Sequence, residues 1–168
     1  MRELKCQYSP EQLVLMSRRI TQALANYIIK KDGINTILLY HSLADEVYTH
    51  DLIMQLREHG KTVLLPTIVG ADLELHEYIS NSSCHTENTY SIQESDGPLF
   101  NDYESIDLAI IPGMAFTKKG HRLGRGKGFY DRLLPKIKCP LLGLAFPFQI
   151  VDTIPCEEHD VLMSYVIS

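Results

Sequence analysis

The sequence predicts an α/β domain with three layers, in which a mostly parallel central sheet is flanked by helices. Short apolar runs typical of buried strands alternate along the chain with segments whose apolar residues recur at helical spacing. The chain has 168 residues, of which 45% are hydrophobic, and this is enough for one domain with a proper core. We therefore expect residues 1–168 to form a single domain.

A long helix is expected near the start of the chain. Ser9 can cap it, Pro10 suits its first turn, and Gln12 can complete a capping box. Apolar residues then recur at helical spacing: Leu13, Met16, Ile20, Leu24 and Tyr27. The pattern predicts a helix with one apolar face that packs on the sheet.

Four shorter elements are expected next. The apolar run "TILLY" at 36–40 predicts a strand, and residues 50–59 predict a helix that Gly60 ends. "TVLLP" at 62–66 predicts the next strand. Residues 73–78 follow closely and alternate more between apolar and polar side chains, which favours an antiparallel strand.

The second half of the chain begins with a polar segment. Residues 80–105 are rich in Ser, Asn and Thr, and we expect an extended loop there. The fully apolar run at 108–113 predicts a buried parallel strand. A helix is then expected from near 127 towards 137, which Pro135 shortens or kinks, followed by strands at 141–146 and 165–167.

Two segments follow directly after expected parallel strands. They are residues 41–46 and the pair Pro112-Gly113. Ligands of such sheets bind at the carboxyl ends of the strands, so we expect both segments at the binding edge.

Charge and composition exclude several classes of protein. The net charge is −5, which argues against a general nucleic-acid or membrane-surface binder. Met1 to Ser9 has no apolar core of the kind a signal peptide needs, and no apolar run approaches the length of a membrane span. We expect a cytoplasmic monomer with no nucleic-acid or membrane partner.

The four cysteines have spacings that suggest no disulfide framework, which favours a reducing compartment. A metal site formed by Cys84, His85 and His76 is a weaker alternative, because their spacing fits no common zinc pattern.

Three alternating glycines form the most unusual stretch. Gly124, Gly126 and Gly128 alternate with Arg125 and Lys127, and we call residues 124–128 the glycine strip. Glycine lets backbone N–H groups approach a ligand closely, and the interleaved cations suggest that this ligand is an anion. A solvated basic loop is the alternative, because residues 118–127 hold five of the sixteen Lys and Arg residues and no acid.

The glycine strip matches neither common nucleotide motif. A Walker A loop would need glycine where His121 stands, and a Rossmann fingerprint would need glycine where Phe129 stands. The spacing alone therefore predicts a backbone anion cradle at a helix start. Tyr130 and Asp131 follow at once, and a carboxylate beside bound phosphates is what Mg²⁺ normally needs.

The run "PGMAFTKKGHRLGRGKGFYDRLL" at 112–134 closely resembles the signature of the 5-formyltetrahydrofolate cyclo-ligase family. Three other segments resemble the family in the right order: "YHSLADEVYTHDLI" at 40–53, "GKTVLLP" at 60–66 and "FPFQIVDTIPCEEHD" at 146–160. The resemblance implies an enzyme that closes 5-formyltetrahydrofolate to 5,10-methenyltetrahydrofolate while ATP becomes ADP and phosphate, with Mg²⁺. Phosphorylation of the formyl oxygen would turn a poor leaving group into a good one, so that N10 can attack the activated carbon.

The resemblance also implies roles for particular residues. It implies catalytic roles for Arg125 and Tyr130. It implies an ATP site at Arg122, Gly124, Arg125, Gly126, Lys127, Gly128 and Tyr130. It implies a folate site at Glu46, Phe116, Tyr130 and Gln149. It implies that Asp131 and Asp160 hold Mg²⁺.

Simpler roles exist for some of these residues. Glu46 could be an acid favoured by the dipole at a helix N-terminus. Asp160 could be a solvated turn acid, and Phe116 could be core.

Three positions depart from the family pattern. Thr117 stands where Asp is common, and Ser95 stands where Pro is usual after Glu94. The family also has a K-x-x-x-R motif ahead of the segment that resembles "YSPEQL", and this sequence has none there. We expect the reading frame to continue upstream of Met1 and to encode those cations. The alternative is a non-catalytic folate- or nucleotide-binding relative that acts as a reservoir or regulator.

Overall fold

The computed structural model describes residues 2–80, 84–85, 94–95, 97–157 and 160–168. In this part of the chain, one seven-stranded sheet has the strand order β11-β10-β7-β1-β2-β3-β6. Its strands are β1 (Thr36–Leu38), β2 (Thr62–Val69), β3 (Asp72–Glu77), β6 (Leu99–Phe100), β7 (Leu108–Ile111), β10 (Leu141–Leu144) and β11 (Tyr165–Ile167).

The sheet is parallel from β11 to β2 and antiparallel at the other end. β1 pairs in parallel with both β2 and β7, and β10 pairs in parallel with β7 and β11. β3 is antiparallel to both β2 and β6. The predicted mostly parallel sheet is confirmed, and the antiparallel strand expected at 73–78 is also present.

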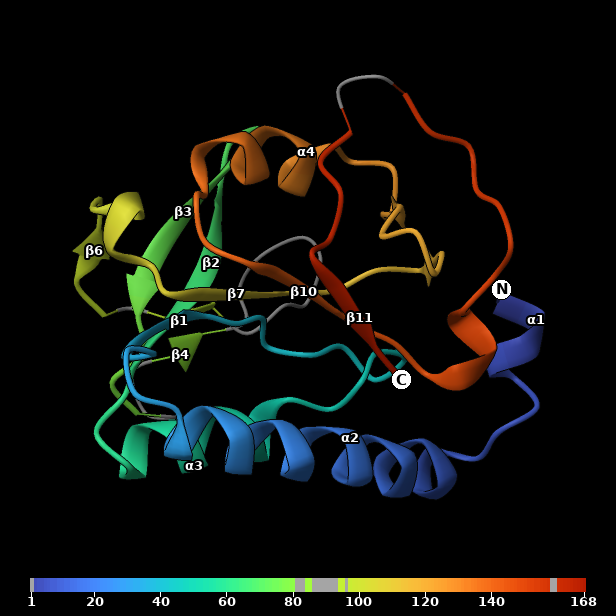
Figure 1. Ribbon diagram of the computed structural model, residues 1–168, viewed down its shortest axis with the longest axis horizontal. Helices are drawn as coiled ribbons and strands as arrows, with labels where there is room; N and C mark the ends of the chain where they lie inside the picture. The colour runs from blue at the N-terminus through green and yellow to red at the C-terminus, as the bar shows by residue number, and fades with distance from the viewer. Residues whose placement is uncertain (1, 81–83, 86–93, 96, 158–159) are drawn as a thin grey trace.

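Helices cover both faces of the sheet (Figure 1). α2 (Pro10–Lys30) and α3 (His50–Glu58) lie on one face, and the short α4 (Phe129–Leu133) lies on the other. α1 (Arg2–Lys5) precedes α2. None of the described helices is long and apolar enough to cross a bilayer.

The start of α2 agrees with the capping box predicted at Ser9. The backbone N–H of Gln12 donates to the Ser9 hydroxyl at 3.3 Å, and the Ser9 N–H donates to the Gln12 side chain at 2.8 Å. The buried face of the helix includes Ile20, Leu24 and Ile28, which continue the predicted apolar spacing.

Two apolar cores lie on opposite faces of the sheet. Ile37 and Leu39 face the side covered by α2 and α3, whereas Leu38 between them faces the side covered by α4. Side chains alternate between the faces of a strand. β1 is therefore buried on both sides, which explains why its sequence is a continuous apolar run.

The prediction of an extended loop over residues 80–105 is wrong at several positions that the structure describes. Two-residue strands β4 (Cys84–His85) and β5 (Glu94–Ser95) pair antiparallel, β6 joins the main sheet, and residues 103–105 form a 3-10 helix. Strands this short carry no readable periodicity. The side chains of Cys84 and His85 lie outside the described part, so the metal alternative there remains a prediction.

A second two-stranded sheet leads into the glycine strip. β8 (Ala115–Phe116) pairs antiparallel with β9 (Arg122–Leu123). The fully buried Phe116 ring packs against two glycines and leaves no room for a side chain on either. A Cβ added to Gly143 would lie 2.5 Å from the nearest atom of the Phe116 ring, and a Cβ added to Gly113 would lie 2.6 Å from the nearest atom of that ring. Phe116 thereby packs this hairpin against β10 and the end of β7.

We expect Gly143→Ala to destabilise the protein by about 1–3 kcal/mol, because the new methyl group overlaps the Phe116 ring. Urea denaturation measures the change in the free energy of unfolding. Phe116→Leu serves as the partner in a double-mutant cycle, and the two substitutions together should lose less than the sum of their separate losses. Strict additivity would show that the predicted overlap is absent.

Candidate functional site

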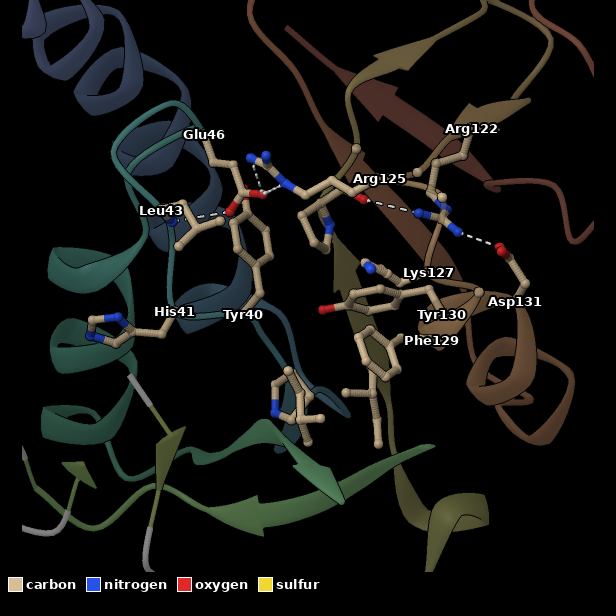
Figure 2. A pocket seen from close by; sticks show the side chains of 18 residues that line it. Tyr40, His41, Leu43, Glu46, Arg122, Arg125, Lys127, Phe129, Tyr130 and Asp131 are labelled. Carbon is tan, nitrogen blue, oxygen red and sulfur yellow. Dashed lines mark hydrogen bonds and ion pairs between the residues drawn. The ribbon is translucent and has the colours of Figure 1, made fainter. Parts of the chain in front are cut away.

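A pocket lies at the carboxyl edge of the parallel strands (Figure 2). Its empty space is about 1120 Å³, including the open solvent at its mouth. Four segments line it: the loop after β1, the turn after β7, the β2–β3 pair, and the run from β9 through the glycine strip to the start of α4. The two segments expected at the binding edge therefore meet in one cavity.

The glycine strip needs glycine for backbone reasons. Gly126 and Gly128 have φ values of +80° and +69°, a left-handed conformation that disfavours side chains. Arg132, one turn further on, donates to the Lys127 carbonyl at 3.3 Å, to the Asp72 carboxylate at 2.9 Å and to the Ala71 carbonyl. The end of the strip is thus tied to the β2–β3 turn.

The loop after β1 is held by a buried threonine. The Thr49 hydroxyl donates to the Tyr40 carbonyl at 2.5 Å and accepts from the Ser42 N–H at 3.2 Å. Glu46 lies inside this loop, and its Oε2 accepts from the Leu43 N–H at 3.0 Å. The Glu46 side chain is only 10% exposed, so the fold holds this carboxylate in a defined place.

Arg125 crosses the pocket to reach that loop. Its Nε and Nη2 donate to Glu46 Oε1 at 3.2 and 3.1 Å, and Nη2 also donates to Asp45 Oδ1 at 2.5 Å. Figure 2 shows the Arg125–Glu46 contacts. The cation predicted for ATP and the carboxylate predicted for folate are therefore partners of each other.

Arg122 lies deeper than Arg125. Its side chain is 6% exposed, and Nη2 lies 2.5 Å from Asp131 Oδ1. The guanidinium also lies 5.4 Å from the centre of the Tyr130 ring. Burial raises the pKa of the Tyr130 phenol, and the Glu46 carboxylate raises it further. Tyr130 is therefore a neutral hydrogen-bond donor at neutral pH.

The remaining wall is apolar. Leu43, Pro66, Ile68, Leu73 and Phe129 line it. An apolar wall opposite a row of cations suits a ligand that has a planar ring system at one end and negative charge at the other.

Histidines flank the loop after β1. The rings of His41 and His50 stack with centres 3.6 Å apart, and His50 Nε2 lies 3.1 Å from the Ser42 carbonyl oxygen. Burial and the neighbouring His50 lower the pKa of His41 to about 4. His41 lines the pocket as a neutral ring, and sequence reasoning assigned it no role.

Three predicted site residues lie elsewhere. The Gln149 amide accepts from the Phe146 N–H at 2.8 Å and donates to the carbonyls of Gly113 and Met114 at 3.0 Å each. Phe116 is fully buried in the core. Asp160 Oδ2 accepts from the Glu157 N–H at 2.8 Å, as a turn acid does. None of these three side chains is among those lining the pocket, so their roles at the ligand remain predictions.

A magnesium ion fits one of the two predicted carboxylates better than the other. Asp131 lines the pocket beside the glycine strip and is 49% exposed. Mg²⁺ is usually held by one or two carboxylates together with substrate phosphates and water. The described residues contain no group of three or more His, Cys, Asp or Glu side chains that could hold a metal ion by themselves. Asp131 supplies one carboxylate, one oxygen of which pairs with Arg122, so this position suits a metal that arrives with a phosphate.

A model of the 5-formyltetrahydrofolate cyclo-ligase family matches residues 1–168. The chain belongs to this family. It is 32% identical to the 5-formyltetrahydrofolate cyclo-ligase of Haemophilus influenzae, over 95% of this chain and 89% of that protein. It is 30% identical to the mouse cyclo-ligase, over 78% of this chain and 71% of that protein.

Solved structures agree with the assignment of the fold. The structure of the 5,10-methenyltetrahydrofolate synthetase of Aquifex aeolicus superposes with a TM-score of 0.83 at 27% identity, covering 98% of this chain and 84% of that one. The family inferred from residues 112–134 is thus confirmed, as is the expectation of a ligase of this family.

The pocket histidine makes the stability of the protein depend on pH. Between pH 6.5 and about 4, the unfolded chain binds a proton at His41 that the folded chain does not. Stability should therefore fall as the pH drops through this range. We expect His41→Gln to reduce that fall in the melting temperature, measured by calorimetry at steps across the range.

The matched control is His59→Gln, because the His59 side chain is exposed. This variant should keep the pH profile of the wild type. An unchanged profile in His41→Gln would show that His41 is not held neutral by burial.

Proposed function

We propose that the protein converts 5-formyltetrahydrofolate to 5,10-methenyltetrahydrofolate and uses ATP and Mg²⁺ to do so. The observation that carries this proposal is the pocket itself. It brings the cationic glycine strip, the Tyr130 phenol and the Asp131 carboxylate together with Glu46, although Glu46 is about eighty residues away in the chain.

The two ends of the pocket suit the two substrates. Arg125 and Lys127 of the glycine strip, together with Arg122 just before it, supply the positive charge that a triphosphate needs. Glu46 lies beside Leu43 on the other side, where its carboxylate can accept two N–H bonds from the amino edge of a pterin. The apolar wall formed by Ile68, Leu73 and Phe129 suits the planar parts of the ligands.

The proposed reaction has two steps, phosphoryl transfer and ring closure. The formyl oxygen attacks the γ-phosphorus of ATP, and the bond from that phosphorus to the β–γ bridging oxygen breaks, which releases ADP. N10 then attacks the formyl carbon and loses its proton, and the bond from this carbon to the phosphorylated oxygen breaks and releases phosphate. The reaction demands mainly positioning and neutralisation of charge.

The residues of the chain have distinct tasks in this scheme. Tyr130 stays protonated because its pKa is raised, so it can donate a hydrogen bond to the formyl oxygen or to the transferred phosphoryl group. Arg122 and Arg125 neutralise the charge that develops on the phosphates. Asp131 would hold Mg²⁺, which supplies further neutralisation of the phosphate oxygens.

The deciding experiment mixes the protein with Mg-ATP and 5-formyltetrahydrofolate and follows the absorbance of the methenyl product. We expect product only when all three components are present, because the formyl oxygen must first be phosphorylated. Equal rates without ATP would exclude the mechanism. Tight folate binding without any product would support the non-catalytic reservoir or regulator instead.

We expect Asp131→Asn to raise the Mg²⁺ concentration needed for half-maximal rate by about tenfold, because a neutral amide is a poorer ligand for a hard cation. Magnesium titrations at saturating ATP measure this shift.

Asp160→Asn is the matched comparison, since Asp160 was the second carboxylate predicted for the metal. It should leave the magnesium requirement unchanged, because Asp160 is not part of the pocket lining. The opposite ranking of the two variants would assign the metal to Asp160.

A further inference from the structure

Asp45 contacts the machinery of the pocket without lining it. Its Oδ1 accepts from Arg125 Nη2 at 2.5 Å, and its Oδ2 accepts from Lys5 Nζ at 3.0 Å. Lys5 also donates to the Asp45 backbone carbonyl at 2.6 Å. The motif did not indicate either residue, yet Asp45 contacts the cation that we assign to the phosphates, and Lys5 is connected to that cation through Asp45.

Four charges thus form one chain of contacts. The cations Lys5 and Arg125 face the carboxylates Asp45 and Glu46, and the sum of these charges is zero. Arg125 Nη2 is shared by both carboxylates. Arg125 in the ligand-free protein is therefore already engaged, and a phosphate must compete for it.

The exposure of the partners shows which contacts can yield. The side chains of Arg125 and Asp45 are 40% and 41% exposed, and ion pairs this exposed contribute little net free energy. Lys5 is only 6% exposed. The Lys5–Asp45 end is consequently the fixed part, whereas the Arg125–Asp45 contact is the one that a multiply charged phosphate group can displace most easily, because Glu46 is only 10% exposed.

We propose that Arg125 is shared between these carboxylates and the nucleotide, so that Asp45 sets nucleotide affinity and the two substrates bind cooperatively. When phosphates withdraw Arg125, Glu46 Oε1 loses its two guanidinium donors and can accept N–H groups of the folate. Oε2 stays held by the Leu43 N–H. Folate in turn competes with Arg125 for Glu46 and releases the cation, because coupling between two sites is reciprocal.

Lys5 has a positioning role in this scheme. Its buried ammonium holds Asp45 in place and offsets its charge, which weakens the attraction of Asp45 for Arg125. Burial alone would raise the pKa of Asp45, but the hydrogen bonds from Lys5 and Arg125 lower it overall. Asp45 is therefore a full negative charge at neutral pH. The inference rests on the proposed function, because it needs both substrates to occupy this pocket.

The test is calorimetric titration of the whole chain with a non-hydrolysable imido analogue of ATP and Mg²⁺, with and without 5-formyltetrahydrofolate. We expect folate to tighten binding of the analogue to the wild type by about fivefold. Asp45→Asn should tighten binding of the analogue by about threefold without folate, because the phosphates then compete with one carboxylate fewer for Arg125. Lys5→Met should weaken it by a similar factor, because Asp45 then keeps an uncompensated charge.

Asp51→Asn is the matched control. Asp51 forms an ion pair with Arg18, and both side chains are partly exposed, but neither lines the pocket. This variant should bind the analogue like the wild type. Asp45→Asn is expected to fold because the amide keeps an oxygen acceptor and the Lys5 ammonium keeps its bond to the backbone carbonyl of residue 45 at 2.6 Å, so this variant remains informative even if removal of the buried Lys5 ammonium prevents folding.

The outcomes separate the two proposals. Weaker or unchanged analogue binding in Asp45→Asn, or no effect of folate on the wild type, would overturn the shared role of Arg125 and leave the proposed reaction intact. A wild-type protein that binds folate but no ATP analogue would overturn the proposed reaction, and the shared role with it.

Discussion

The parallel pairing of β1 with β7 is the constraint on which the pocket depends. Ile37 pairs with Leu108 in this register, so both strands end at the same edge of the sheet. The loop that carries Glu46 and the turn that leads to the glycine strip must then leave the sheet side by side. Both strands are buried on each face, and a slip of register would expose an apolar set of side chains to water. The packing of the core thus fixes the relative position of the two halves of the site.

Sequence patterns predicted the parts of this fold that are long or strongly periodic. The capping box at Ser9 and the apolar runs at 36–40 and 108–113 led to α2, β1 and β7. Short elements were missed because two residues have no period, as in β4 and β8. The helix expected over residues 127–137 is shorter: α4 ends at Leu133, and a 3-10 turn that contains a proline follows.

The residues of the candidate site were also predictable only in part. The glycine strip, Tyr130 and Asp131 lie in one contiguous motif, and the structure brings Glu46 to them. The contacts of Lys5 and Asp45 could not be read from the sequence, since partners forty and eighty residues apart meet only through the fold. Gln149 illustrates the converse case. Its side chain matches the motif, yet two of its three hydrogen bonds join the segment after β10 to the turn after β7, and the third lies within that segment.

The tie between Arg132 and the β2–β3 turn has a consequence for the entropy of phosphate binding. Ordering the backbone of a free loop costs about 1–2 kcal/mol per residue, and glycine loses the most freedom of any residue. The β8–β9 pair restrains one end of the glycine strip, and Arg132 restrains the other through the Lys127 carbonyl. Much of the ordering of these glycines is therefore complete when the chain folds. An arriving anion meets backbone groups that already have little freedom left to lose.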